Sequence, residues 1–277
     1  MSGLVLVTGA TGKTGRSLIA QLSAKEIPYR AASRTGERPF DWTRPETWEP
    51  ALDGVAAVYL VAPPAVDDPY AKIIDFLTAA QRSGPRRFVF LGMAGLPAGG
   101  PAHGQVHQWL ADNSDDWAVL SPSAFMQNFS EGPLLAGIRD EATFYSNTAT
   151  GRVGFIDAHD IAAAAFAALT APGPINSDLV LTGGQTLSYD DVAELISQAC
   201  GRPITHTHIS TEALIERFLA RGLPAATAQF LAFGYQTIAG GYQDWTTETF
   251  QSLTGKRPAT FQAFAEANAK TWQQSGA

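Results

Sequence analysis

Three glycines, Gly9, Gly12 and Gly15, lie near the start of the chain at a spacing that suits a bound dinucleotide. They follow the apolar run Leu4–Val7, which reads as a buried strand, and they open a helical pattern. At this spacing Gly9 permits a tight turn, Gly12 lets the backbone approach a pyrophosphate, and Gly15 lets the helix pack closely on the strand. We therefore predict that the phosphates bind at this turn, and the contacting residues are Gly9, Thr11, Gly12, Lys13, Thr14 and Gly15.

Two histidines, His103 and His107, stand four residues apart on a predicted helix over residues 103–112. This spacing places both imidazoles on one helix face, and either could donate a proton near neutral pH. We predict them as catalytic residues, and the alternative is that both face solvent on an exposed helix. His206 and His208 share a strand face but have no further ligand at a suitable spacing, so we expect no metal site.

Strand and helix patterns alternate through the first two thirds of the chain, which predicts a parallel sheet with helices on both faces. We expect an α/β fold, a Rossmann-type doubly wound parallel sheet with a smaller, mostly helical C-terminal substrate cap. The predicted domains are 1–155 for the nucleotide, with 156–182 contributing to the sheet, and 183–277 for the cap. Predicted strands lie at 4–7, 28–33, 55–61, 87–91, 117–120 and 179–181, and Ser188 with Asp191 predicts a capping box at the start of a helix.

Ligands of such sheets lie outside the carboxyl ends of the strands. The cap should therefore close over residues 62–64 and 92–95, where we expect Ala62, Pro63, Pro64 and Met93 to contact the cofactor. At the end of the second predicted strand, Ser33 and Arg34 stand where NAD-selective sites carry an acidic residue. A guanidinium can bind a 2′-phosphate that a carboxylate would repel, which favours NADP(H). The alternative is that Arg34 is a solvated loop residue.

The composition excludes several classes of protein. Of the 277 residues, 45% are hydrophobic and 16% are charged, the net charge is −7, and Cys200 is the single cysteine. No basic field exists for nucleic acid, no apolar run approaches the length of a membrane span, and no disulfide can form within the chain. Because a predicted strand lies at the start of the sequence, we expect no signal peptide. We expect a cytoplasmic monomer or homodimer that acts on a small molecule, without nucleic acid or membrane partners.

Several segments together resemble the NmrA-like atypical short-chain dehydrogenase/reductase family. They are Val7–Gly12, Arg86–Leu91, the segment Leu120–Phe129 and the segment Phe155–Ala162. The third segment is the most specific, although Ser121 replaces the usual Arg, and residues 103–107 are similar to the helix that ergot alkaloid reductases carry beside the nicotinamide. Triphenylmethane and quinone reductases are further members. Within the third segment, Phe125, Met126 and Asn128 are candidate substrate contacts, or else core and turn residues.

The chain lacks the usual acid of a short-chain dehydrogenase. No Tyr is followed by Lys four residues later, and Gly92-Met93-Ala94 stands where a Ser is usual. Reduction of an unactivated ketone would be difficult without an acid, whereas an iminium, quinone, enone, azo dye or cationic dye needs less help. We therefore expect an NADPH-dependent reductase of such acceptors. The alternative is a non-catalytic NADP(H) redox sensor that binds a regulatory protein.

Overall fold

The computed structural model describes residues 3–35, 38–63, 66 and 68–273. Six strands form one sheet, and every neighbouring pair of strands in this sheet is parallel. The chain order reverses at β1, because β1 pairs with β2 on one side and with β3 on the other. Across the sheet the strands are β2 (Tyr29–Ala31), β1 (Leu4–Val7), β3 (Val55–Leu60), β4 (Arg87–Leu91), β5 (Trp117–Pro122) and β8 (Ser177–Leu181).

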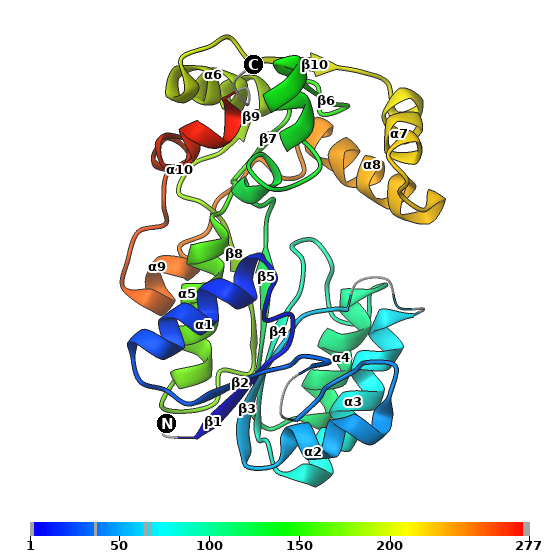
Figure 1. Cartoon of the computed structure of the whole chain (residues 1–277), viewed down its shortest axis with the longest axis vertical. Helices are drawn as coiled ribbons and strands as arrows, with labels where there is room; N and C mark the ends of the chain where they lie inside the picture. Colours follow the sequence, from blue (N-terminus) through cyan, green and yellow to red (C-terminus); the bar gives the residue numbers. More distant parts are fainter. Residues whose placement is uncertain (1–2, 36–37, 64–65, 67, 274–277) are drawn as a thin grey trace. The chain divides into compact units, whose positions relative to one another are not determined.

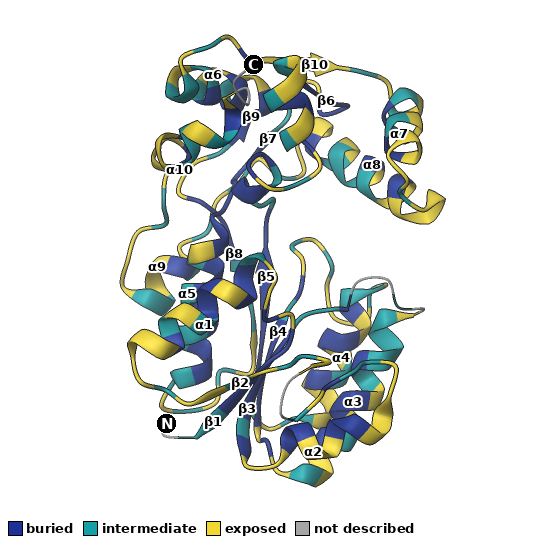
Figure 2. Cartoon of the chain, viewed as in Figure 1, coloured by how far each residue is buried: buried dark blue, intermediate teal, exposed yellow. Residues whose placement is uncertain are grey.

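Helices cover both faces of this sheet (Figure 1), which confirms the predicted doubly wound Rossmann-type fold. One face carries α1 (Lys13–Ala24), α5 (Ala158–Thr170) and α9 (Thr249–Thr254). The other carries α2 (Trp48–Leu52), α3 (Pro69–Ser83) and α4 (His103–Asn113), with a 3₁₀ turn, Pro45–Thr47, before α2. The central strands are buried almost throughout (Figure 2), as expected for parallel strands covered on both sides.

The alanine-rich helix α5 packs against α1 and against the central strands. Its small side chains Ala162, Ala164, Ala165 and Ala168 are fully buried, so its backbone can approach the sheet closely. Arg87, at the start of β4 and only 4% exposed, pairs with Asp116 at 2.9 Å. Its guanidinium also donates to the carbonyls of Ala168, Leu169, Ala171 and Gly173 at and beyond the end of α5. A cation at these orphan carbonyls stabilises the helix end.

The chain folds into two compact units, and the sheet just described belongs to the first. The first unit comprises Met1–Pro122, Ala158–Leu181 and Thr249–Lys256, and the second comprises Ser123–Asp157, Thr182–Glu248 and Arg257–Ala277. Residues 123–155, which the sequence reading placed in the nucleotide domain, therefore lie in the second unit. The reason is local: Ser123 donates a hydrogen bond to the carbonyl of Gly154, and Phe125 forms a parallel bridge with Ile156.

The second unit has its own apolar core and two small sheets. In one sheet β6 (Thr143–Ser146) pairs in parallel with β10 (Thr205–His208). In the other β7 (Arg152–Val153) pairs antiparallel with β9 (Leu187–Ser188). The predicted capping box is confirmed at the start of α6, where Ser188 and Asp191 each bind the other's backbone N–H. In chain order, the elements of the second unit are a 3₁₀ turn (Met126–Asn128), a π-helical turn (Gly137–Glu141), β6 (Thr143–Ser146), β7 (Arg152–Val153), β9 (Leu187–Ser188), α6 (Tyr189–Cys200), β10 (Thr205–His208), α7 (Thr211–Ala220), α8 (Ala225–Ala239), α10 (Phe261–Asn268) and a 3₁₀ turn (Ala269–Trp272). Among the described residues of both units, no helix has the length and apolar character that crossing a bilayer requires.

Candidate functional site

The glycine-rich turn leaves the start of α1 open to an anion. Gly12 is the N-cap residue, in an extended conformation, and its N–H donates to the Gly9 carbonyl at 2.8 Å. Within the described residues no side chain caps α1, and its first turn contains no acidic residue. Thr11 and Gly12 are exposed and Lys13 is half-buried. The N–H groups and the positive end of the helix dipole therefore form a site suited to phosphate groups.

Gly9 and Gly15 are required by the geometry of this turn. Gly9 has a φ of 60°, in the left-handed region that side chains disfavour. A Cβ on Gly15 would overlap the carbonyl oxygen of Gly9. The close packing of α1 on the turn thus depends on these two positions, which agrees with the roles that their spacing predicts.

A buried network ties the turn to β3. The Thr8 hydroxyl donates to the carbonyl of Tyr59 at 3.0 Å and accepts from the N–H of Val61 at 2.8 Å. The Tyr59 hydroxyl donates to Thr14 Oγ1 at 3.0 Å, and burial raises the pKa of Tyr59 well above its usual range. Thr14 is itself buried, so its hydroxyl serves this network while its backbone N–H belongs to the first turn of α1. Thr8 and Tyr59 were not among the site residues predicted from sequence.

Beyond β2, Ser33 and Arg34 form a short turn at the surface. The Ser33 hydroxyl accepts from the N–H of Thr35 at 3.3 Å, and Arg34 is exposed. Asp41, which was not among the site residues predicted from the sequence, interacts electrostatically with Arg34. Hydrogen bonds from Thr43, and then the charges of Arg34 and Arg44, lower the pKa of Asp41. Among the described residues, the carboxylate that interacts electrostatically with Arg34 is that of Asp41, whose Oδ1 already accepts two hydrogen bonds from Thr43.

The ends of β3 and β4 lie at the same edge of the sheet as the glycine turn, since the strands are parallel. Ala62 is half-buried and Pro63 is buried, while the predicted contact Pro64 lies outside the described residues. Met93 is 36% exposed just after β4. Ser121, which replaces the family's usual Arg, is buried in β5 and donates to Asp178 at 2.5 Å.

The two histidines of α4 have different surroundings. His103 is half-buried at the first residue of α4, with its ring 5.8 Å from that of Phe90 and its Nδ1 3.2 Å from the hydroxyl of Tyr70. Burial lowers the pKa of His103 from 6.5 to about 4. His107, one turn later, is buried against Trp117, the first residue of β5, with ring centroids 5.4 Å apart. Its Nδ1 has no hydrogen-bond partner among the described residues.

His103 therefore lies toward the carboxyl edge of the sheet, and His107 lies in the core toward the amino end of β5. The alternative reading, in which both imidazoles face solvent, is wrong because His107 is 8% exposed. The four-residue spacing brings both rings to the sheet-facing side of α4 but does not bring them to one site.

The three candidate substrate residues lie in the second unit. Met126 is 2% exposed within the apolar core of that unit, which favours a packing role. Phe125 and Asn128 are half-buried on either side of it. Phe125 forms the bridge to Ile156, and Asn128 ends a 3₁₀ turn.

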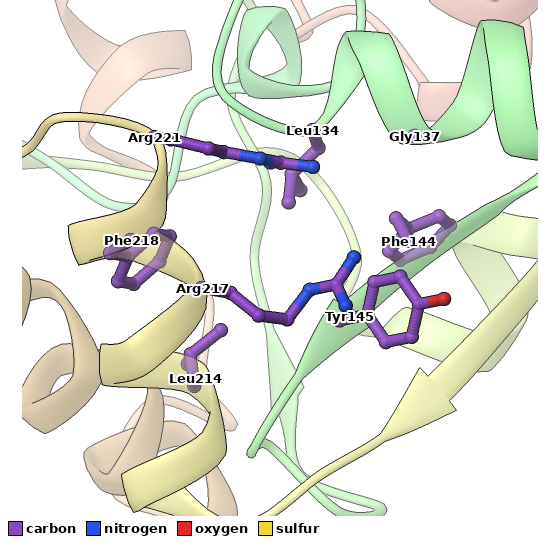
Figure 3. A pocket seen from close by; sticks show the side chains of 8 residues that line it. All are labelled: Leu134, Gly137, Phe144, Tyr145, Leu214, Arg217, Phe218 and Arg221. Atoms are coloured by element: carbon purple, nitrogen blue, oxygen red, sulfur yellow. The ribbon is translucent and has the colours of Figure 1, made fainter.

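A small hollow, with a cavity volume of about 10 Å³, opens in the second unit between α7, β6 and the π-helical turn. Two arginines extend across it (Figure 3): Arg217 of α7 toward Tyr145, and Arg221, which follows α7, toward Leu134. The Arg217 guanidinium lies 3.6 Å from the centroid of the Tyr145 ring and 3.8 Å from Glu141. Arg221 donates to the Pro133 carbonyl at 2.8 Å. Both guanidinium groups are thus engaged within the protein.

His206 of β10 is a structural residue of the second unit. Its ring stacks on Phe144, Nδ1 donates to Asp190 at 2.8 Å, and Nε2 lies 2.7 Å from the Ser146 hydroxyl. Burial lowers the pKa of His206, although Asp190 opposes the shift. His208 uses its Nδ1 to accept from the N–H of Ala149 at 3.1 Å.

Comparison with known proteins gives relatives that span almost the whole chain. It is 36% identical over 275 residues to the uncharacterized oxidoreductase YesF of Bacillus subtilis, covering 97% of this chain and 96% of that protein. Agroclavine dehydrogenase of Claviceps fusiformis is 35% identical over 287 residues, 97% of this chain and 98% of the enzyme. NAD(P)H azoreductase of Xenophilus azovorans is 31% identical over 285 residues, 96% of this chain and 98% of the enzyme. No protein-family profile matches the chain.

Solved structures share the fold. Citrobacter sp. triphenylmethane reductase complexed with NADP(H) superposes with a TM-score of 0.81 at 22% identity, over 96% of this chain and 99% of the reductase. NmrA, a negative transcriptional regulator in complex with NAD, gives a TM-score of 0.70 at 16% identity, over 96% of this chain and 94% of NmrA.

Proposed function

Since this chain belongs to the NmrA-like family of atypical short-chain dehydrogenases/reductases, we propose that it is an NADPH-dependent reductase of activated small organic acceptors. The observation that carries the proposal is the uncapped start of α1 behind Gly9, Gly12 and Gly15, at the point where the strand order reverses. Dinucleotides bind at this point of doubly wound sheets. Relatives named as dehydrogenase and azoreductase support oxidoreductase chemistry over the full length of the chain.

The choice of NADPH over NADH rests on the end of β2. Arg34 is exposed there, and Ser33 beside it has a hydroxyl that can donate to a phosphate oxygen. Among the described residues, the negative charge near Arg34 is Asp41, and this carboxylate is also stabilised by hydrogen bonds from Thr43 and by the charge of Arg44. A 2′-phosphate brings about two negative charges within reach of Arg34, so it gains charge-assisted hydrogen bonds that a 2′-hydroxyl lacks.

The nature of the acceptor follows from the missing acid. Ala62, Pro63 and Met93 at the strand ends would orient a nicotinamide and exclude water, and the nicotinamide would supply the hydride. The chain has no Tyr-x-x-x-Lys motif. The proton donors predicted from the sequence are instead His103 and His107 of α4. Acceptors that are electron-poor before binding fit this site best: quinones, enones, imines and iminium ions, azo compounds and cationic dyes. The Citrobacter reductase is named for a triphenylmethane substrate, and the Claviceps and Xenophilus enzymes for agroclavine and azo compounds.

The test is a screen that follows NADPH oxidation by absorbance with a quinone, a cyclic imine and a cationic triarylmethane dye. We expect turnover of at least one, with NADPH bound more tightly than NADH. Arg34→Asp should weaken NADPH by about 2–3 kcal/mol, or roughly 30- to 200-fold, and NADH much less. Arg86→Asp, an exposed change just before β4 and at the opposite edge of the sheet, is the matched charge control.

Two results would contradict the proposal. Equal affinity of the wild type for NADH and NADPH would refute the cofactor preference. Tight NADPH binding with no turnover of any acceptor would refute the reductase activity and would instead support a non-catalytic redox sensor.

A further inference from the structure

Two polar side chains from neighbouring helices meet at the carboxyl edge of the sheet. Tyr70 is the second residue of α3, which follows β3, and His103 is the first residue of α4, which follows β4. Because β3 and β4 are adjacent and parallel, both helices begin at the edge where the glycine turn lies. The Tyr70 hydroxyl is 3.2 Å from His103 Nδ1, and the ring centroids are 4.9 Å apart.

The surroundings keep both groups uncharged at neutral pH. The two side chains are half-buried, and the ring centroid of Phe90 lies 5.8 Å from that of the imidazole. Burial raises the pKa of Tyr70 and lowers that of His103 to about 4. Within the part of the chain that the structure describes, no Asp, Glu, Lys or Arg side chain contributes to either shift. At pH 7 the pair therefore holds two transferable protons without a charge.

We infer that Tyr70 and His103 form the proton relay of the reductase, with Tyr70 as the catalytic acid and His103 as its positioning residue. This inference rests on the proposed function. It supplies a proton donor in place of the Tyr-x-x-x-Lys motif, but a weaker one, because burial raises the pKa of Tyr70; an electron-poor acceptor is therefore still required.

The step balances as follows. As hydride adds to the acceptor, its π electron pair moves to the oxygen or nitrogen. That atom takes the proton from the Tyr70 hydroxyl, and the Tyr70 oxygen takes the proton from His103 Nδ1. A hydronium ion from solvent gives its proton to His103 Nε2 and becomes water, so the ring ends as its other neutral tautomer and no charge remains on the protein. The relay requires that His103 Nδ1–H donates to the Tyr70 oxygen, which leaves the phenolic proton for the acceptor.

The relay predicts which substrates need Tyr70. A quinone or enone must be protonated as it is reduced, whereas a cationic triarylmethane dye becomes neutral on hydride arrival alone. Tyr70→Phe should lower kcat for the quinone by about 100-fold or more, and leave kcat for the dye and the NADPH Kd within about twofold. His103→Phe should give the same selective loss, and His103→Asn, which keeps an N–H donor, should recover part of it. Tyr29→Phe removes a partly exposed phenol bonded to Ser23 and is the control.

A second measurement needs neither substrate nor cofactor. Nitrogen-15 NMR of the histidine rings in the free protein should show His103 neutral and protonated at Nδ1, with the Nδ1 signal moved by Tyr70→Phe.

A third measurement is made during turnover. The solvent deuterium isotope effect on quinone reduction should differ between the wild type and His103→Phe.

The outcomes separate the relay from the proposed function. If the wild type reduces the dye but Tyr70→Phe loses nothing on the quinone, or loses equally on both acceptors, the relay is overturned and the reductase stands. A neutral His103 protonated at Nε2, with Tyr70 donating to Nδ1, would also overturn the relay. A wild type that reduces no acceptor would overturn both.

Discussion

Replacing His103 with Phe should reduce the amount by which the free energy of unfolding falls as the pH is lowered. Burial holds the pKa of His103 at about 4 in the folded chain, against 6.5 for the free side chain. Below pH 6.5 the unfolded chain therefore binds a proton at this position that the folded chain does not. The sign follows: His103 has no effect on pH dependence well above pH 6.5, and it destabilises the fold increasingly as the pH falls from 6.5 toward 4.

The magnitude follows from the same two pKa values. Between pH 7 and pH 5, proton linkage at His103 should lower the free energy of unfolding by about 2 kcal/mol. Below pH 4 the effect should level off at about 3 kcal/mol, since each pKa unit is worth about 1.4 kcal/mol. His103 is mostly buried, so solvent screens this term weakly. A Phe ring fits among Tyr70 and Phe90 without a titrating group.

Urea unfolding of the wild type, His103→Phe and Tyr70→Phe at pH 7 and pH 5 measures this term. The difference between wild type and His103→Phe should change by about 2 kcal/mol between the two pH values. Tyr70→Phe keeps the buried imidazole and should keep the slope of the wild type, because burial is the sole cause of the shift. Parallel curves for the wild type and His103→Phe would refute a buried, neutral His103. They would also remove the physical basis for its role as an uncharged donor.

Three further changes test the sheet and the glycine turn. Arg87→Met should lower the free energy of unfolding in urea by about 3–5 kcal/mol, because Asp116 and the carbonyls after α5 lose their partner. The control Arg86→Met changes an exposed side chain and should have little effect, and equal effects of the two substitutions would contradict this account. Gly12→Val should abolish NADPH binding, measured by calorimetry, in a chain with unchanged circular dichroism, since the side chain occupies the space of the pyrophosphate; retained affinity would place the cofactor elsewhere. Gly15→Ala should lower the melting temperature, because its Cβ overlaps the Gly9 carbonyl, and an unchanged melting temperature would show that the turn can shift.

The local features of this chain could be predicted because their causes are local. Four apolar residues before three spaced glycines predict a strand, a turn and a helix, and β1 and α1 have those positions. Ser188 and Asp191 predict a capping box because each side chain reaches a backbone N–H three residues away.

The contacts of His103 could not be predicted in this way. A spacing of four places His103 and His107 on one face of α4, but one turn is about 5.4 Å along the axis. The strands below run in that direction, so His103 meets Phe90 near the end of β4 and His107 meets Trp117 at the start of β5. Tyr70 is 33 residues from His103, and their meeting depends on the adjacency of β3 and β4. The one signal in the sequence was that both residues open a helix after a predicted strand.

The division of the chain into two interleaved units limits how this protein can be dissected or recombined. Each unit is assembled from three separate stretches, so the backbone passes from one unit to the other five times. A fragment ending at Pro122 would lack α5 and β8, which would strip Arg87 of its helix-end carbonyls and turn β5 into an unprotected edge strand. The second unit cannot be replaced by exchanging one contiguous gene segment, because its three stretches would have to be exchanged together. Change in specificity by point substitution within the existing loops is therefore the more accessible route for engineering, and for natural divergence.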